Sequence, residues 1–293
     1  MSTGRIIRGI GGFYYVLPDS GGPEVECKAR GHFRKSGISP VVGDLVIYAD
    51  QKEGHSVIEE ILPRKNLLIR PAVANIDQLL IVISASAPAP DWLLVDKLII
   101  QAVPAGIKPV LILNKSDTAD EEIVRNFDQD YVPWFQTVVV SAKTGSGREQ
   151  LADILKDQIS CFAGQSAVGK SSLINLLLPE LALETGDLAR KTDRGRHTTR
   201  RAELWPAFGG AVLDTPGFSL YETDLLDQSD LNRCYPEFGN TPEKCRFPSC
   251  MHITEPGCAV KELVASGKIS RGRYERYAIL AKEYETRRKH IYG

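Results

Sequence analysis

Two motifs of a nucleotide-binding sheet occur in this sequence in an unusual order. The segment LILNKSD covers residues 111–117, and CFAGQSAVGKSSLINLL, which contains a phosphate-loop pattern, covers residues 161–177. In an ordinary guanine-nucleotide switch, the phosphate loop opens the domain and the NKxD segment lies far downstream. A chain with the reversed order can form the same sheet only if it enters that sheet at a different strand.

The phosphate-loop pattern stands in the sequence context that it requires. ISCFA reads as a buried strand before it and SLINLLL as a helix after it. The backbone N–H groups of such a loop surround the phosphates, Lys170 neutralises β- and γ-phosphate charge, and Ser171 ligates Mg²⁺. The residues predicted to bind the phosphates are Gly164, Gln165, Ser166, Ala167, Val168, Gly169, Lys170, Ser171 and Ser172.

Two further motifs predict that the base is guanine. Asn114-Lys115-Ser116-Asp117 ends a predicted strand, and Asp117 can accept hydrogen bonds from N1–H and the 2-amino group of guanine, which adenine does not offer. Ser141-Ala142-Lys143 ends the next strand, TVVV, so the Ala142 N–H is in position to meet guanine O6. Either motif alone is common. Their joint occurrence at the carboxyl ends of strands, where such sheets bind ligands, predicts a GTP site.

The γ-phosphate side of the site is predicted from residues downstream of the phosphate loop. Asp214-Thr-Pro-Gly217 follows the strand GGAVL, so Asp214 is placed to hold a Mg²⁺-bound water and the Gly217 N–H to meet the γ-phosphate. In the segment DRGRHTTRR, Thr199 is predicted to contact Mg²⁺ and the γ-phosphate, with Thr198 as the near alternative. We therefore expect Mg²⁺ to bind together with GTP.

The sequence lacks the glutamine that many GTPases use to orient the attacking water. Phe218 stands at that position, so we expect slow intrinsic turnover and a catalytic group from elsewhere. His197 is the candidate, as a residue that positions water once a partner orders its loop. The alternative interpretation is a solvated or RNA-contacting loop histidine. The predicted catalytic set is His197, Lys170, Thr199 and Gly217.

The order of strands explains the order of motifs. From Asp77 to about Tyr235, apolar strands alternate with helical segments, which is typical of a parallel sheet covered by helices on both faces. We predict a circularly permuted Ras-like P-loop GTPase in which residues 157–160 join the usual last helix to the usual first strand. The segment that responds to the γ-phosphate then runs directly into the C-terminal part, which is predicted to receive the nucleotide signal.

The first 70 residues alternate short β-like runs with turn signals. Five such runs predict a small closed barrel. Aromatic and basic residues interleave along it, which suits stacking on RNA bases and contact with phosphates, although part of the aromatic set fits a barrel core equally well. The residues concerned are Arg5, Arg8, Tyr14, Tyr15, Lys28, Arg30, His32, Phe33, Arg34 and Lys35.

Two local positive segments lie within a chain whose formal net charge is -1. Six of the twelve residues from Arg190 to Arg201 are basic, and from Ala259 to Gly293 nine basic residues stand against four acids. Part of the second segment, at about 270–290, has the spacing of a helix. Each segment is either a nucleic-acid contact or a solvated face, and charge alone does not separate the two.

The six cysteines fall into two groups. Cys245-x₄-Cys250-x-His252-x₅-Cys258 places four soft ligands in a short, Pro- and Gly-containing segment that cannot build a core. A Cys₃His set with all four positions filled suits one structural Zn²⁺, and the alternative is reduced cysteines packed in a loop. The scattered cysteines are predicted to be buried as small apolar side chains; they are Cys27, Cys161 and Cys234.

The whole pattern resembles a known family. NKSD, SAK, GQSAVGKSS, GRHTT and DTPG in permuted order, between a barrel and a Cys/His cluster, resemble the ribosome-small-subunit-dependent GTPases, RsgA. The resemblance covers almost the whole chain. It implies an OB-fold at the N-terminus, a zinc-binding C-terminal domain, GTP hydrolysis stimulated by the small (30S) ribosomal subunit, contact with its rRNA, and a role late in the maturation of that subunit.

The expected domains are an OB-fold RNA-binding barrel at 1–70, the permuted GTPase at 71–235, and a zinc-binding domain with a basic C-terminal helix at 236–293. The sequence contains no apolar run of the roughly 18 residues that a membrane helix needs and no signal peptide, so we expect a cytoplasmic monomer without a membrane partner. The competing hypothesis is an RNA-binding assembly protein in which GTP is only a conformational ligand.

Overall fold

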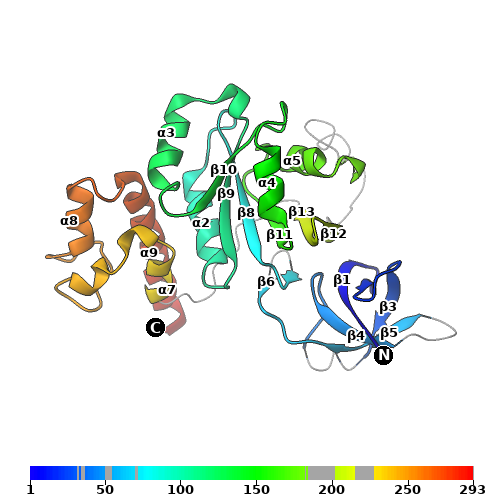
Figure 1. The fold of residues 1–293 in the computed structure, drawn as a ribbon. Helices are drawn as coiled ribbons and strands as arrows, with labels where there is room; N and C mark the ends of the chain where they lie inside the picture. The colour runs from blue at the N-terminus through cyan, green and yellow to red at the C-terminus, as the bar shows by residue number, and fades with distance from the viewer. Residues whose placement is uncertain are drawn as a thin grey trace.

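The computed structural model describes residues 1–31, 33, 37–49, 55–69, 72–181, 183, 202–214 and 228–292. These residues form a barrel, a central α/β sheet with its helices, and a helical C-terminal unit that comprises residues 228–292 (Figure 1). Figure 1 shows the barrel at lower right and the C-terminal unit at left, so the central sheet lies between the two ends of the chain.

Five strands close the barrel. They are β1 (Ser2–Ile10), β2 (Phe13–Pro18), β3 (Val25–Ala29), β4 (Leu45–Ala49) and β5 (Ser56–Ile61), and they pair in the order β1-β2-β3-β5-β4, with β4 returning to β1. Alternate side chains point inward. The buried interior contains Ile6, Val16, Cys27, Phe33, Val46, Tyr48 and Ile58. The predicted five-strand barrel is therefore confirmed.

A short hairpin leads from the barrel to the central sheet. It consists of β6 (Leu67–Ile69) and β7 (Ala72–Ala74), which the sequence did not predict because strands of three residues show no alternation. Gly43 of the barrel packs against this hairpin: a Cβ on Gly43, whose φ is +91°, would lie 2.0 Å from the Ala74 carbonyl oxygen. The barrel also meets the sheet where Arg8 of β1 pairs with Glu203 of β12.

The central sheet has the strand order β10-β9-β8-β11-β13-β12. The first five strands are parallel and β12 is antiparallel to β13. Its elements in chain order are β8 (Gln78–Ser84), α2 (Trp92–Ala102), β9 (Lys108–Asn114), η1 (Ser116–Thr118), α3 (Glu121–Asp130), β10 (Gln136–Val139), α4 (Arg148–Leu155), β11 (Ile159–Ala163), α5 (Lys170–Leu177), η2 (Pro179–Leu181), β12 (Glu203–Ala207) and β13 (Gly210–Asp214).

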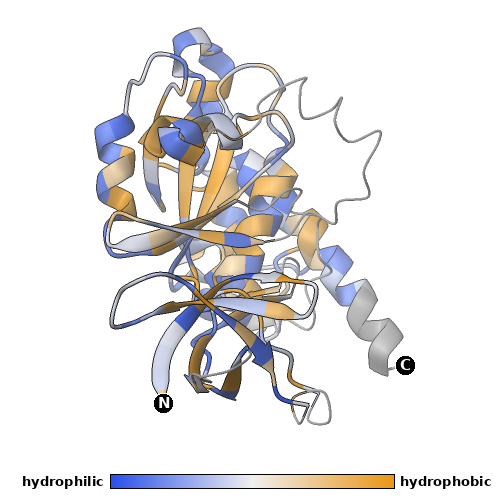
Figure 2. Cartoon of the chain, turned by 90° about the vertical axis from the view of Figure 1, so that its right-hand side faces the viewer, coloured by the Kyte–Doolittle hydropathy of each residue, from blue (hydrophilic) through white to orange (hydrophobic). Residues whose placement is uncertain are grey.

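Helices cover both faces of this sheet, as predicted. Every residue of β8 is buried, because its alternate side chains enter two separate cores. Leu79 and Ile81 belong to the core with α2 and α3, whereas Leu80 and Val82 belong to the core with α4 and α5. Figure 2 shows the resulting apolar strands between polar helix surfaces.

The permutation is visible in the connection between α4 and β11. Only residues 156–158 join them, close to the predicted link at 157–160. Asp157 lies in the left-handed region, with φ at +57°, and its N–H donates to the Phe208 carbonyl at 2.9 Å, which fixes the reversal. The strand that leads into the phosphate loop, β11, thus lies in the middle of the sheet, although it follows the base-binding strand β9 in the sequence.

The C-terminal unit consists of short helices around one long helix. Its elements are α7 (Gln228–Arg233), η3 (Pro236–Phe238), η4 (Thr241–Lys244), α8 (Ala259–Ala265) and α9 (Arg271–Tyr292), and the last of these matches the helix predicted at 270–290. No helix within the described ranges has the length and apolar character needed to cross a bilayer.

Candidate functional site

The phosphate loop joins β11 to α5 and is shaped by two glycines. Gly164 has φ at +134°, and a Cβ there would lie 2.3 Å from the Val82 carbonyl oxygen of the neighbouring strand. Gly169 has φ at +98°, and a Cβ there would lie 2.4 Å from the Asn114 Nδ2 atom. Both positions therefore exclude a side chain, and the second one does so because the base-binding motif packs directly against the loop.

Asn114 joins the three predicted motifs. Its Nδ2 donates to the Val168 carbonyl at 2.9 Å, and its Oδ1 accepts from the Ala142 N–H at 3.1 Å. The side chain is buried, with 1% of the residue exposed. The Ala142 N–H is the group predicted to meet guanine O6. Because it already faces Asn114, a base at this position has to share it.

Two lysine side chains donate hydrogen bonds to backbone carbonyls of the phosphate loop. Lys115 Nζ donates to the carbonyls of Ala167 (2.9 Å) and Ala87 (2.6 Å), and burial lowers the pKa of this amine. Lys170 Nζ, the predicted phosphate ligand, donates to the carbonyls of Gly164 (2.9 Å) and Gln165 (2.8 Å). The Lys170 amine is therefore folded back on the backbone of the loop.

The predicted base-recognising carboxylate is held by the neighbouring motif. Asp117 Oδ1 accepts a hydrogen bond from Ser141 Oγ at 2.7 Å, and Lys143 Nζ lies 3.8 Å from Oδ2. The hydrogen bond from the Ser141 hydroxyl lowers the pKa of Asp117 against the opposing effect of burial, with smaller contributions from a backbone N–H and from the charge of Lys143. The carboxylate stays ionised, as acceptance of two guanine N–H groups requires.

The other predicted phosphate residues lie where the pattern places them along the chain. Ser166 and Ala167 are exposed at the tip of the loop, Val168 is buried beneath it, and Ser171 and Ser172 lie in the first turn of α5. The Gln165 side chain turns toward α2, where its Oε1 accepts from the Asp91 N–H at 3.2 Å.

Asp214 ends β13 opposite Phe162 of β11, so its backbone lies beside the strand that leads into the phosphate loop. The remaining residues predicted on the γ-phosphate side are outside the described residues. They are His197, Thr198, Thr199, Gly217 and Phe218.

The predicted metal ligands converge in the C-terminal unit. The ligand atoms of Cys245, Cys250, His252 and Cys258 all lie within 4.8 Å of one another. His252 Nδ1 is 3.5 Å from the Cys245 Sγ and 3.4 Å from the Cys258 Sγ, and these two sulfurs are 4.0 Å apart. A tetrahedral zinc centre, with Zn–S about 2.3 Å and Zn–N about 2.0 Å, requires separations of about 3.5–3.8 Å. The residues therefore fit a bound metal ion.

The loop that carries His252 is fixed by residues that the sequence analysis did not single out. The Glu255 carboxylate accepts from the N–H groups of Met251 (2.8 Å), Ile253 (3.0 Å) and Thr254 (3.0 Å). From α9, Tyr274 Oη donates to the His252 carbonyl at 2.7 Å. Burial raises the pKa of the Cys250 thiol to about 12 and lowers that of His252, so binding of a metal displaces thiol protons at neutral pH.

The structure divides the residues predicted for RNA contact into two groups. Phe33 is buried in the barrel and Tyr14 packs against its core, so neither presents a free ring face. Tyr15 points out of the barrel, but it is half-buried against the main core, and Arg8 lies over its ring at 4.2 Å. Lys28 is exposed. Arg30 pairs with Glu59 at 2.6 Å, and the half-buried Arg5 donates to the Gly43 carbonyl at 3.0 Å. His32, Arg34 and Lys35 fall outside the described residues.

Phe13 and His55 complete this outer face, although the sequence analysis missed them. Lys28 Nζ lies 4.9 Å from the centre of the Phe13 ring, and the His55 ring meets Phe13 edge-on at 4.8 Å. The signal that could have revealed them is the register that places Phe13 opposite Lys28, which the sequence alone does not fix. We call Arg8, Phe13, Tyr15, Lys28 and His55 the barrel face.

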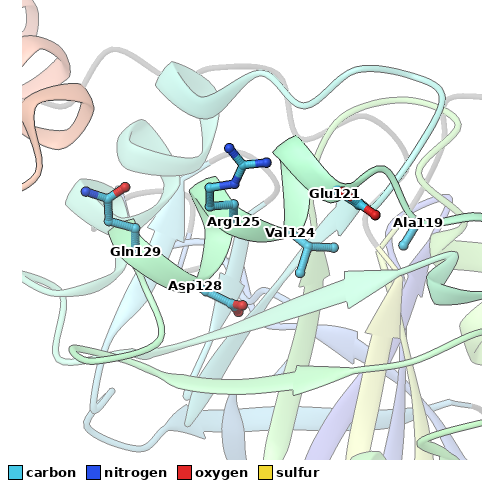
Figure 3. A pocket seen from close by; sticks show the side chains of 6 residues that line it. All are labelled: Ala119, Glu121, Val124, Arg125, Asp128 and Gln129. Atoms are coloured by element: carbon cyan, nitrogen blue, oxygen red, sulfur yellow. The ribbon is translucent and has the colours of Figure 1, made fainter.

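A separate open hollow of about 640 Å³ lies on α3 (Figure 3). Its described lining comes from α3 and the turn before it and includes Glu121, Arg125 and Asp128. Among its described lining residues there are none of the predicted nucleotide, metal or barrel-face residues. This mixture of charges on one helix identifies no ligand.

Comparison with known proteins places the chain in a family. Residues 61–224 match the family described as RsgA GTPase, and residues 3–58 match the RsgA N-terminal domain. A small ribosomal subunit biogenesis GTPase RsgA from Caldanaerobacter subterraneus is 49% identical over 99% of this chain and 98% of its own, and one from Ruminiclostridium cellulolyticum is 45% identical over 96% and 93%.

Two solved structures share the fold. YjeQ from Thermotoga maritima superposes with a TM-score of 0.83 at 37% identity, over 96% of this chain and 98% of its own. YloQ, described as a circularly permuted GTPase, gives 0.79 at 34% identity, over 98% and 96%. The predicted barrel and permuted GTPase fold are therefore confirmed. Together with the convergence of the nucleotide motifs, these matches show that the chain belongs to the RsgA GTPase family and is a GTP hydrolase.

Proposed function

We propose that this GTPase acts in the late maturation of the small ribosomal subunit, where it binds ribosomal RNA and hydrolyses GTP when the subunit stimulates it. The observation that carries the proposal is the contact of Asn114 with both Val168 and Ala142, which supports one guanine-nucleotide site built from motifs in permuted order. The names of the curated relatives, small ribosomal subunit biogenesis GTPase, support the choice of partner.

The nucleotide lies with its base against Asp117 and its phosphates over the loop between Gly164 and Ser172. Asp117 selects guanine, Lys115 and Asn114 hold the loop in shape, and the loop N–H groups bind the phosphates. Lys143 covers the base edge beside Ser141. This division of roles follows from the positions of the side chains: one end of the site offers a carboxylate, and the other end offers N–H donors and the amine of Lys170.

Magnesium binds together with GTP, with Ser171 and Thr199 as its ligands and Asp214 acting through a water molecule. When bound, the ion neutralises charge on the phosphate oxygens. Ser171 lies in the helix that follows β11, and Asp214 ends β13. These two strands are neighbours in the sheet, which supports a shared site. Thr199, the Gly217 N–H and His197 complete the γ-phosphate side, with Thr198 as the alternative to Thr199.

The metal cluster holds one structural Zn²⁺ through Cys245, Cys250, His252 and Cys258. Four protein ligands leave no open coordination position, so the ion stabilises the fold and takes no part in hydrolysis. The separations between the ligand atoms and the burial of His252, of which 1% is exposed, support this assignment. Zinc holds together a segment that has few apolar side chains of its own.

The barrel face binds RNA. Phe13 offers a ring on which a base can stack, and the exposed Lys28 beside it offers a charge for a phosphate. Arg8 is already paired with Glu24 and Glu203 and covers the Tyr15 ring, so these two residues have to rearrange in order to contact RNA. The functional units are 1–70, 71–235 and 236–293, for RNA contact, GTP hydrolysis and zinc binding. A ribosomal partner implies a cytoplasmic protein, and we propose that it works as a monomer.

The test is GTP turnover measured with and without purified small subunits. A large acceleration by the subunits, lost at high salt because phosphate contacts weaken with ionic strength, is the expected result. Turnover that is equal in both conditions, with RNA binding that still depends on the nucleotide, would favour the alternative function. In that case the chain is an RNA-binding assembly protein that uses GTP only as a conformational ligand.

A further inference from the structure

Helix α2 lies between the phosphate loop and the C-terminal unit. On one face, Leu94, Val95 and Leu98 meet Gly164, Gln165 and Val168 around a cavity of only about 10 Å³. A cavity of this size holds at most about one water molecule, so the helix packs closely on the loop. A displacement of this part of the loop therefore has to displace α2.

The first turn of α2 is also hydrogen-bonded to the loop. Asp91 caps the helix, because its carboxylate accepts from the Leu94 N–H at 2.9 Å. The N–H of the same residue donates to Gln165 Oε1 at 3.2 Å. The second residue of the phosphate loop is thus tied to the residue that starts the helix.

The other face of α2 carries a buried carboxylate that the C-terminal unit holds. Asp96, which is 1% exposed, accepts from Arg273, from Arg276 Nε at 2.8 Å and from Tyr131 Oη at 2.7 Å. Burial opposes the charge of Arg273, but Asp96 and Glu237 raise its pKa well above the ordinary value. The Arg273 guanidinium therefore stays charged despite its burial.

Both arginines bind a second acid as well. Arg273 Nε donates to Glu237 at 2.7 Å, and Arg276 donates to Asp130 of α3 at 2.7 Å. A planar guanidinium shared between two buried acids has one geometry, so it resists sliding of α9 along α2. The same helix holds the metal loop through Tyr274 and the His252 carbonyl.

We propose that Asp96, Arg273 and Arg276 form a positioning network that couples nucleotide binding at the phosphate loop to the seating of the C-terminal unit on α2. The proposal rests on the proposed nucleotide site only in assuming that phosphates occupy this loop. Occupation of the loop shifts α2 through Gln165 and Asp91, and the shift reaches Asp96 on the same rigid helix. By thermodynamic linkage, packing of the C-terminal unit on α2 changes the nucleotide affinity by the same factor by which the nucleotide changes that packing equilibrium.

The test is a double-mutant cycle on the affinity for a fluorescent GDP analogue, with the variants Gln165→Ala and Arg276→Gln. We expect the two effects to be non-additive by at least about threefold, although the residues share no contact. Glu283→Gln is the matched control, because it breaks the more exposed pair of Lys97 and Glu283, 3.3 Å apart, between the same two helices. Additive effects for Gln165→Ala and Arg276→Gln, or an equal coupling for Glu283→Gln, would overturn the proposal.

A second measurement separates coupling from simple loss of stability. Binding of GDP should change hydrogen exchange of α9 amides in the wild-type chain and should change it much less in Gln165→Ala, whose C-terminal unit is untouched. An identical exchange response in both proteins also overturns the proposal. If Arg276→Gln does not fold, Arg276→Lys keeps the charge but cannot bridge Asp96 and Asp130, and it takes its place in the cycle. Failure of GDP to bind the wild-type chain would instead refute the proposed function.

Discussion

The Asn114 Nδ2 atom donates to the Val168 carbonyl at 2.9 Å, across 54 positions of the chain. The base-binding strand β9 precedes the phosphate loop in the sequence. In the sheet only β8 separates β9 from β11, so the end of β9 reaches the loop that follows β11. The Asn114 side chain thus bonds to the loop at Val168 and packs against Gly169. Base recognition and loop shape depend on the same side chain.

Asp117→Asn should change the base that the protein selects. The substitution removes the acceptor for guanine N1–H and the 2-amino group, while an amide can pair with xanthine. Because each of the two lost hydrogen bonds to the carboxylate contributes roughly 1.5–3 kcal/mol, GDP affinity should fall at least about 100-fold. Xanthosine diphosphate should gain affinity in the same titrations with fluorescent nucleotides.

Asp120→Asn is the matched control for this change of base. Asp120 also precedes α3, but its carboxylate caps that helix by accepting from the Glu122 N–H at 2.9 Å. Its substitution should leave the preference for guanine intact. Equal loss of GDP affinity in both variants would show that Asp117 has no special role.

Ser141→Ala should shift the acid limb of nucleotide binding to higher pH. The Ser141 hydroxyl lowers the pKa of Asp117, so the ionised, base-binding form persists above that lowered pKa and is lost as the pH falls through it. Without the hydroxyl the pKa of Asp117 rises toward its ordinary value, and the loss of affinity begins at higher pH. GDP affinity measured between about pH 6 and about pH 3 gives the shift, because this range includes the ordinary pKa of an aspartate. Ser146→Ala serves as the control, and an unmoved limb in Ser141→Ala would refute the assignment.

The fold was predictable wherever the sequence pattern is local. The apolar run of β8 and the motifs at strand ends predicted the permuted sheet, and alternation predicted the barrel. The sequence left open whether each aromatic residue of the barrel contacts RNA or fills the core, and burial places Phe33 in the core. The contact of Asp96 with Arg273 spans 177 positions and leaves no trace in the sequence near either residue.

Cys258→Ser should abolish metal binding. Purified wild-type protein should contain one zinc ion per chain, and the variant close to none, because a hydroxyl cannot replace a thiolate ligand. A chelator should lower the melting temperature of the wild-type chain but not that of the variant. Cys234→Ala is the control, since Cys234 is buried in the same unit but lies outside the cluster, and its substitution should leave the zinc content unchanged.

Phe13→Ala should weaken binding to small subunits. Stacking of a base on an aromatic ring contributes about 1–3 kcal/mol, so affinity should fall by about 5- to 150-fold at constant salt. Lys28→Ala should instead reduce the slope of log affinity against log salt by about one unit. Lys156→Ala removes a charge from the surface near β11 and should leave both quantities unchanged. An unaffected affinity in Phe13→Ala would exclude the barrel face.

His197→Ala should abolish the stimulation of GTP hydrolysis by small subunits while leaving GTP affinity intact. Phe218 can neither donate nor accept a hydrogen bond, so a side chain other than the usual glutamine has to orient the attacking water. Single-turnover hydrolysis with and without subunits isolates this step from nucleotide exchange. His290→Ala, another histidine of the chain, is the control for general loss of an imidazole. If His197→Ala retains the full stimulated rate, His197 is not the catalytic group. It then either contacts RNA or has no role in hydrolysis.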